Sequence, residues 1–152
     1  MLARFRKAMQ EEEQGFTLIE LLVVIIIIGI LAAVAVPVFL NQRKKGWDAQ
    51  AQSDAKNLST IEETYFTDNN AYALVAAGST GAAAHGVLSD YNPSSTIATV
   101  TIKGYDSTGA ITTTAANAVN GYCIDVKSKS GNYYTWDSSK GGLQAVGTAA
   151  KC

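Results

Sequence analysis

The stretch GFTLIELLVVIIIIGILAAVAVP, residues 15–37, decides the fold. It opens a run of 20 residues, Leu21 to Leu40, that carries no charged or strongly polar side chain. At about 1.5 Å of rise per helical residue, such a run crosses the roughly 30 Å hydrocarbon core of a bilayer. We therefore expect a membrane-spanning helix over residues 16–45, with Glu20 as the carboxylate at its edge.

The composition changes on both sides of this stretch. Residues 1–15, MLARFRKAMQEEEQG, are polar, and Gly15 is the small residue that precedes the apolar run. A secretory signal instead places its small-residue cleavage site after the apolar centre, so cutting at Gly15 would leave the apolar run in the mature protein. From Gly46 onward, Ala, Thr, Ser, Gly and Tyr predominate, which predicts a small water-facing head. The net charge of −1 indicates no strong preference for nucleic acid or acidic lipid.

Residues 15–37 resemble the class III signal of type IV pilins and pseudopilins. The resemblance implies that residues 1–15 are a leader, that a prepilin peptidase cuts between Gly15 and Phe16, and that Phe16 becomes N-methylated. It also implies that, in a filament, the carboxylate of Glu20 meets the amino group of Phe16 on an adjacent subunit. The residues alone allow an alternative, in which Glu20 sits at the lipid headgroups in the first helical turn, where the helix dipole favours negative charge.

Gly29 and Pro37 frame the second part of the apolar run. Proline lacks the backbone donor and crowds the carbonyl of Ala33, and glycine weakens a helix by about 1 kcal/mol relative to alanine. We expect a kink in the isolated subunit and, as the resemblance also implies, local unwinding between these residues in a filament. An ordinary kinked membrane helix is the alternative.

Residues 46–70 predict an amphipathic continuation, so that one helix extends from about Phe16 to Thr67. Apolar residues recur at steps of three and four, while most polar residues fall between them. The expected apolar face consists of Trp47, Ala51, Ala55, Leu58, Ile61 and Tyr65. The expected polar positions are Asp48, Gln52, Lys56, Glu62 and Glu63.

The remainder predicts a loop over residues 71–95, with at most a short helical turn, and an antiparallel sheet head over residues 96–152. Strand composition and hairpin-length turns favour four strands, at residues 96–103, 109–114, 122–128 and 132–138. The fold class is α+β, a long amino-terminal helix packed on a carboxy-terminal antiparallel sheet, which is also the fold that the pilin resemblance implies.

Two cysteines and one histidine limit the chemistry of the head. In an oxidising compartment Cys123 and Cys152 would close a loop of about 30 residues, worth roughly 3 to 4 kcal/mol, whereas two free buried thiols are the alternative. A disulfide there would correspond to the carboxy-terminal loop of many pilins. His85 reads as a solvated loop residue, and the residue set predicts no metal site and no cofactor.

No phosphate-binding loop, nucleophile elbow or catalytic cluster is present in the sequence, so we expect no enzyme activity. Assembly would need a separate ATPase. Lys127, Lys129 and Lys140 lie near Tyr133, Tyr134 and Trp136, a composition that suits a face for single-stranded DNA. Sheet packing with solvated lysines is the favoured interpretation.

The resemblance therefore implies a structural subunit of a type IV pilus, a homo-oligomeric filament that serves adhesion, motility or DNA uptake. Before assembly the subunit would cross the cytoplasmic membrane once, with its head outside, next to an inner-membrane assembly platform. A major pseudopilin of a type II secretion system, which shares the signal, is the first alternative. A single-pass anchored binding module that never polymerises is the second, and it leaves Gly15, Phe16 and Glu20 without a role.

Overall fold

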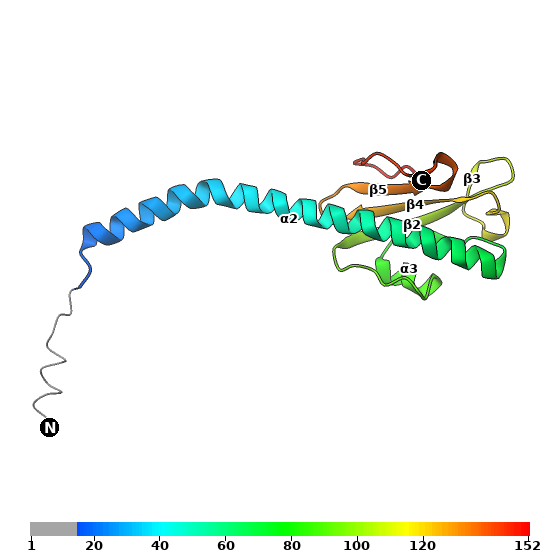
Figure 1. Cartoon of the computed structure of the whole chain (residues 1–152), viewed down its shortest axis with the longest axis horizontal. Coiled ribbons are helices and arrows are strands. Elements are labelled where there is room, and N and C mark those ends of the chain that lie inside the picture. Colours follow the sequence, from blue (N-terminus) through cyan, green and yellow to red (C-terminus); the bar gives the residue numbers. More distant parts are fainter. Residues whose placement is uncertain (1–14) are drawn as a thin grey trace, which may run out of the picture. The chain divides into compact units, whose positions relative to one another are not determined.

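The computed structural model describes residues 15–152 as two compact units that divide after Leu40. Helix α2, Leu18–Asn69, begins in the first unit and ends in the second (Figure 1). The predicted long helix is confirmed, with each end two residues further along the chain. Most of the predicted leader, residues 1–14, lies outside the described residues.

In the first unit, the large apolar side chains point outward. Their exposed fractions run from 42% at Leu22 to 87% at Phe16. By length and composition, α2 is the one helix among residues 15–152 that is able to cross a membrane, and its most apolar window buries nothing within the chain. Pro37 lies inside α2, and the space around Gly29 is open. Kinking and unwinding at these two residues stay predictions.

In the second unit, one face of α2 packs into the head. Ala51, Ala55 and Leu58 are fully buried, as the three- and four-residue spacing predicts. The same face also buries Asp54 and Glu62. Glu62 was predicted to be on the polar face, and that prediction was wrong, because the segment after the helix folds back over it.

The head contains a six-stranded antiparallel sheet in the order β1-β2-β4-β5-β6, with β3 paired to β2. The strands are β1 Val75–Ser79, β2 Ile97–Tyr105, β3 Ile111–Thr112, β4 Tyr122–Ser128, β5 Tyr133–Asp137 and β6 Gly142–Leu143. Between them lie α3 Gly81–Val87 and two short 3-10 turns, η1 Ala115–Asn117 and η2 Ser138–Lys140.

The prediction of four strands was wrong in number. Strand β1 lies in the segment predicted to be a loop, and its sequence VAAGS lacks the β-branched or aromatic run that signals a strand. Strand β6 has only two residues, and β3 is shorter than predicted. These strands form because β2 and β5 offer backbone partners, which is information that local composition does not carry.

The register of the central strands places the core on the face next to α2. Ile102 pairs with Ile124, and Val126 pairs with Tyr134, and all four side chains are buried. Alternate positions point to the opposite face, where Thr101, Asp125 and Thr135 form a cross-strand row. These polar residues are buried as well, and Asp125 contacts the carboxy-terminal segment.

Candidate assembly site and the head that carries it

Thr17 and Glu20 cap the start of α2. The hydroxyl and the backbone N–H of Thr17 donate to Oε2 of Glu20 at 2.9 and 2.8 Å, and the Glu20 N–H donates to the Thr17 hydroxyl at 3.2 Å. These contacts form a capping box, which satisfies backbone donors that a helix start leaves free. Sequence reasoning did not assign a role to Thr17, although the spacing Thr-x-x-Glu at 17–20 was the signal for it.

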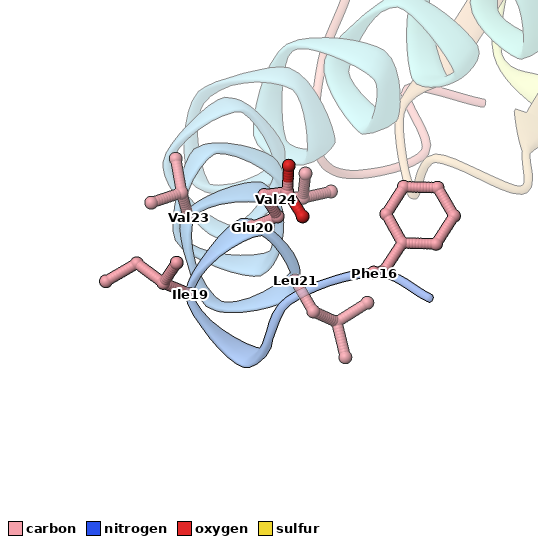
Figure 2. A pocket seen from close by; sticks show the side chains of 6 residues that line it. All are labelled: Phe16, Ile19, Glu20, Leu21, Val23 and Val24. Carbon is pink, nitrogen blue, oxygen red and sulfur yellow. The ribbon is translucent and has the colours of Figure 1, made fainter. Parts of the chain in front are cut away.

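The predicted cleavage position lies just outside the helix. Gly15 and Phe16 precede α2 and are exposed, and Figure 2 shows the Phe16 ring on the chain end that leads into α2, with Glu20 on the first turn. Both side-chain contacts of Glu20 end on Oε2, so within residues 15–152 its Oε1 atom accepts no hydrogen bond. One carboxylate oxygen therefore remains open to an outside donor.

In the uncut chain, the nitrogen of Phe16 is part of a peptide bond to Gly15. Cutting that bond would turn it into an amino group that carries a positive charge at neutral pH. The arrangement can thus acquire a cation four positions before the helical carboxylate only by proteolysis. Within one chain, however, the Glu20 carboxylate is already engaged by Thr17.

In the head, Asp54 fastens the loop that follows α3. Its Oδ2 atom accepts from the Tyr91 hydroxyl at 2.9 Å and from the Ser94 N–H at 3.0 Å, and its Oδ1 atom accepts from the Ser94 hydroxyl at 2.7 Å. Burial and the adjacent Asp54 carboxylate raise the pKa of Tyr91, so the phenol keeps its proton and remains a donor. A buried carboxylate is tolerated here because several donors surround it.

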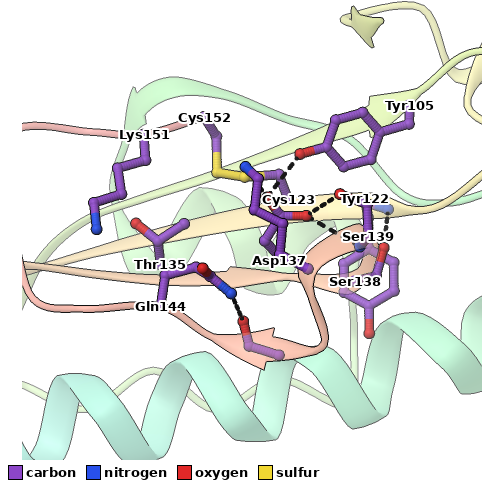
Figure 3. Close-up of polar contacts among 12 residues, drawn as sticks. Tyr105, Tyr122, Cys123, Thr135, Asp137, Ser138, Ser139, Gln144, Lys151 and Cys152 are labelled. Atoms are coloured by element: carbon purple, nitrogen blue, oxygen red, sulfur yellow. Dashed lines mark hydrogen bonds and ion pairs between the residues drawn. A yellow bond between two sulfur atoms is a disulfide. The ribbon is translucent and has the colours of Figure 1, made fainter. Parts of the chain in front are cut away.

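The carboxy-terminal segment is held against the outer face of the sheet. A disulfide joins Cys123 and Cys152 with a Cα–Cα distance of 5.8 Å, as the resemblance implied (Figure 3). Oδ2 of Asp125 accepts from the backbone N–H groups of Lys151 and Cys152 at 3.0 and 2.8 Å. The Lys103 ammonium donates to the Cys152 carbonyl at 2.6 Å. The last residues are therefore attached by polar contacts as well as by the covalent bond.

Asp137, at the end of β5, accepts hydrogen bonds from several donors. The hydroxyls of Tyr105 and Ser139 donate to it at 3.0 and 2.7 Å (Figure 3). The Lys140 ammonium donates to it at 2.7 Å. Burial opposes ionisation of this carboxyl group, but the hydrogen bonds from Lys140, Ser139 and Tyr105 outweigh burial and lower the pKa of Asp137. The network fixes the turn η2 to the sheet.

The predicted aromatic and basic face is divided by the sheet. Tyr134 is buried in the core, and Lys140 forms an ion pair with Asp137. Trp136 packs against the core on the same face as Tyr134, whereas the Lys127 ammonium lies 5.2 Å from the centre of the Tyr133 ring. The six residues therefore do not form one surface, because neighbouring strand residues point to opposite faces, which agrees with the favoured interpretation that the aromatic residues serve sheet packing.

Glu62 is the one buried carboxyl group in the helix–sheet core that lacks a full set of partners. Its Oε2 atom accepts from the Ala73 N–H at 3.1 Å, while its Oε1 atom is buried without a hydrogen bond among the described residues. Burial raises the pKa of Glu62 to about 8, and the nearby charge of Glu63 adds to the effect. At neutral pH the group is mostly protonated, which reduces the cost of burying it.

His85 is exposed, as predicted, but it is not free of contacts. Its Nδ1 atom lies 2.6 Å from the carbonyl oxygen of Tyr91, so the ring joins α3 to the loop that Asp54 holds. Among residues 15–152, no group of three or more His, Cys, Asp or Glu side chains is placed to bind a metal.

The amino-terminal segment is similar in sequence to known proteins. A family model described as a prokaryotic N-terminal methylation motif matches residues 12–36. The chain is 41% identical over 59 residues to the type IV major pilin protein PilA of Myxococcus xanthus. The matched residues make up 39% of this chain and 27% of that protein. It is 44% identical over 70 residues to the type IV wide pilus major component PilA4 of Thermus thermophilus, covering 43% of this chain and 53% of that one.

A third relative belongs to a secretion system. The chain is 41% identical over 71 residues to the type II secretion system core protein G of Aeromonas hydrophila, covering 46% of this chain and 50% of that protein. The matches span from about a quarter to about half the length of these relatives. The amino-terminal part of this chain is therefore similar to type IV pilins and to pseudopilins, and its helix-on-sheet fold is consistent with the pilin fold.

Proposed function

We propose that this chain is a structural filament subunit that polymerises through its apolar helix as a type IV pilus. The observation that carries the proposal is the exposed apolar surface of residues 16–40, with Glu20 as its acidic group and one oxygen of that group open. A prepilin peptidase would cut between Gly15 and Phe16 and methylate Phe16. The methylation motif and the pilin relatives support this processing.

In the filament, the apolar helices would pack against one another and leave lipid. An unpaired carboxylate in such surroundings is penalised by several kcal/mol, so Glu20 needs a cation. The amino group of Phe16 on an adjacent copy provides one. A copy that is out of register would bury both charges without partners, so the pair would select the correct register.

The subunit would be stored in the inner membrane with its head outside and then transferred to an extracellular filament. An assembly platform in that membrane and a separate ATPase would act on it. The proposed role is structural, with no reaction assigned to the chain.

Intact mass and amino-terminal sequencing of protein from sheared surface filaments, and separately from membranes, test the proposal. We expect a chain in the sheared fraction that begins at N-methylated Phe16 and is two hydrogens lighter than its reduced form, because of the disulfide. A chain that begins at Met1 and occurs only in membranes would overturn both the processing and the filament.

A pseudopilus of a type II secretion system is the second candidate, because core protein G relatives match this chain as well as the pilins do. Deleting the pilus assembly ATPase or the secretion ATPase in the native host separates the two. Loss of surface filaments in the first deletion alone supports the pilus. Loss of a secreted substrate when this chain is removed, with filaments unaffected by the pilus ATPase, supports the pseudopilus.

A further inference from the structure

A groove of about 250 Å³ lies in the head between the last turns of α2 and the segment from Val87 to Asp90. Its lining is mostly polar and includes Asp68 and Asp90, while Ile61, Tyr65 and Val87 contribute the smaller apolar part. A second hollow of about 360 Å³ shares Ile61 and Asp90 with it, so the groove continues along α2 toward Asn57.

Asp68 and Asp90 differ from the buried carboxylates of the head. Both are exposed, and within residues 15–152 neither side chain takes part in a hydrogen bond or an ion pair. A mostly polar groove with two free carboxylates and a smaller apolar part matches a lysine or arginine side chain, whose charged end is paired while its aliphatic stem packs.

The chain itself carries such side chains at Arg43, Lys44 and Lys45, here called the basic turn. All three are exposed, and the ion pair of the described residues, Lys140 with Asp137, involves none of them. The Arg43 guanidinium lies 4.8 Å from the centre of the Trp47 ring, which leaves its hydrogen-bond donors free. No other run of three consecutive basic residues occurs in the sequence.

The basic turn cannot reach the groove of its own copy. Lys45 and Asp68 are 23 positions apart on α2, and at about 1.5 Å per residue about 35 Å of helix separates them. A lysine side chain extends only about 6 Å from its backbone, so complementary charges at the two places can meet only between copies.

We propose that the groove at Asp68 and Asp90 binds the basic turn of a second copy of this chain. The inference rests on the proposed filament, and it requires neighbouring copies to be shifted along the helix axis by about 35 Å, the separation of Lys45 and Asp68 within one copy. Successive helical residues lie about 100° apart around the axis, so one or two of the three side chains enter the groove. Exposed ion pairs are individually weak, and their effect here is to fix the register of neighbouring heads.

Charge reversal tests the contact. Lys44→Glu with Lys45→Glu, and separately Asp68→Lys with Asp90→Lys, should each reduce the yield of sheared filaments roughly tenfold, because each places like charges in contact. Combining the four substitutions should restore most of the yield, since the charges are again complementary. The matched control is Lys56→Glu with Lys129→Glu, two exposed lysines outside the lining of the groove, which makes the same change of charge and should leave the yield unchanged. Normal yield from either reversal, or no recovery in the combination, overturns the proposal.

Zero-length carbodiimide crosslinking is a second test of the contact, because it joins amines to carboxylates only where the two are in direct contact. Wild-type filaments are assembled from mixed light and heavy isotope-labelled chains. A mixed-isotope peptide joining Lys44 or Lys45 to Asp68 or Asp90 is expected. Filaments that form without this product refute the groove contact while leaving the filament proposal intact, whereas the absence of filaments refutes the proposed function itself.

Acidic lipid headgroups are the rival partner for the basic turn. In that case the Lys44→Glu, Lys45→Glu chain would be depleted from membranes before assembly, and reversing Asp68 and Asp90 would not rescue it. We expect normal membrane levels of that variant, and depletion without rescue would overturn the proposal.

Discussion

The carboxylates of the two units differ in burial and in their hydrogen-bond partners. In the first unit, Glu20 lies on an exposed helix, Thr17 is its one side-chain partner among residues 15–152, and one oxygen stays open. In the head, Asp54 is buried and accepts hydrogen bonds from Tyr91 and Ser94, and Asp125 accepts from the carboxy-terminal segment. Asp54 and Asp125 find their donors within the head, whereas the first unit leaves one oxygen of its carboxylate and its apolar side chains open to other molecules.

The difference separates folding from assembly. A buried carboxylate with several donors stabilises the structure in which it lies, and removing it leaves donors unpaired inside the protein. An exposed carboxylate next to an apolar surface contributes little to one copy, and its effect appears only when the surface is covered. Changes at Glu20 should therefore affect filaments, and changes to the buried carboxylates of the head should affect stability.

The largest effect should follow from Glu20→Ala. We expect filament yield to fall by an order of magnitude or more, because the amino group of Phe16 on the adjacent copy would be buried unpaired. Leader removal and membrane insertion should be unchanged, since neither needs this charge. The yield of sheared filaments measures assembly. The intact mass of the protein in the membrane fraction measures leader removal and insertion.

Glu20→Gln sharpens this comparison, because the amide still accepts a hydrogen bond from Thr17 but carries no charge. Its filament yield should be nearly as low as that of the alanine variant. Glu63→Gln, an exposed carboxylate on the same helix in the head, is the matched control. Wild-type filament yield from Glu20→Ala would remove the role assigned to this residue.

The next largest effect concerns Glu62, the head carboxyl that resembles Glu20 in lacking a full set of partners. Burial raises the pKa of Glu62 to about 8 in the folded head, above its ordinary value of 4.5. Between those values the folded state holds a proton that the unfolded state has released. The free energy of unfolding is therefore highest with respect to this group below about pH 4.5. It falls as the pH rises to about 8, by at most about 1.4 kcal/mol per pH unit.

Glu62→Gln removes this titration and should flatten the dependence of the unfolding free energy on pH between about 4.5 and 8. At pH 8 the variant should be more stable than the wild type by up to about 5 kcal/mol, less the cost of an unpaired amide. Thermal unfolding of the full chain in detergent micelles, followed across that pH range, measures it. Asp68→Asn, at an exposed position further along the same helix, should keep the wild-type slope, and an unchanged slope in Glu62→Gln would contradict the assignment.

Asp54→Ala should destabilise the head by about 2 to 4 kcal/mol, because the Tyr91 hydroxyl and the Ser94 N–H lose their acceptor in a buried place. The matched change Asp68→Ala, at an exposed position on the same helix, should stay within about 0.5 kcal/mol of the wild type. Near-ultraviolet circular dichroism during thermal unfolding compares them. Equal melting temperatures would show that the loop after α3 is not held by Asp54.

The sequence predicted those parts of the fold that depend on local pattern. The apolar run and the spacing of Ala51, Ala55 and Leu58 predicted α2, and alternation in Tyr122–Ser128 predicted β4. Strands β1 and β6 were missed because they depend on neighbouring strands rather than on their own residues. Thr17 was also missed, although its spacing from Glu20 was visible.

The buried carboxylates could not be predicted from spacing. Asp54 and Glu62 look like solvent-facing residues of an amphipathic helix until the loop after α3 and the segment at Ala73 are placed over them. Their burial is decided by contacts 11 and 40 positions away in the sequence. The cysteine pair, in contrast, offered only one intramolecular disulfide, because the chain has two cysteines.

The smallest effect should follow from Thr17→Ala, which removes the cap of α2 and leaves the charge of Glu20 in place. We expect a loss of about 1 kcal/mol at the helix start, seen as faster hydrogen exchange of the first-turn amides in micelles. Filament yield should fall less than twofold, because the freed carboxylate can still pair with an amino group on an adjacent copy. If Thr17→Ala reduced filaments as strongly as Glu20→Ala, then Glu20 would act through the helix start of its own chain. The open oxygen on Glu20 would then have no bearing on assembly.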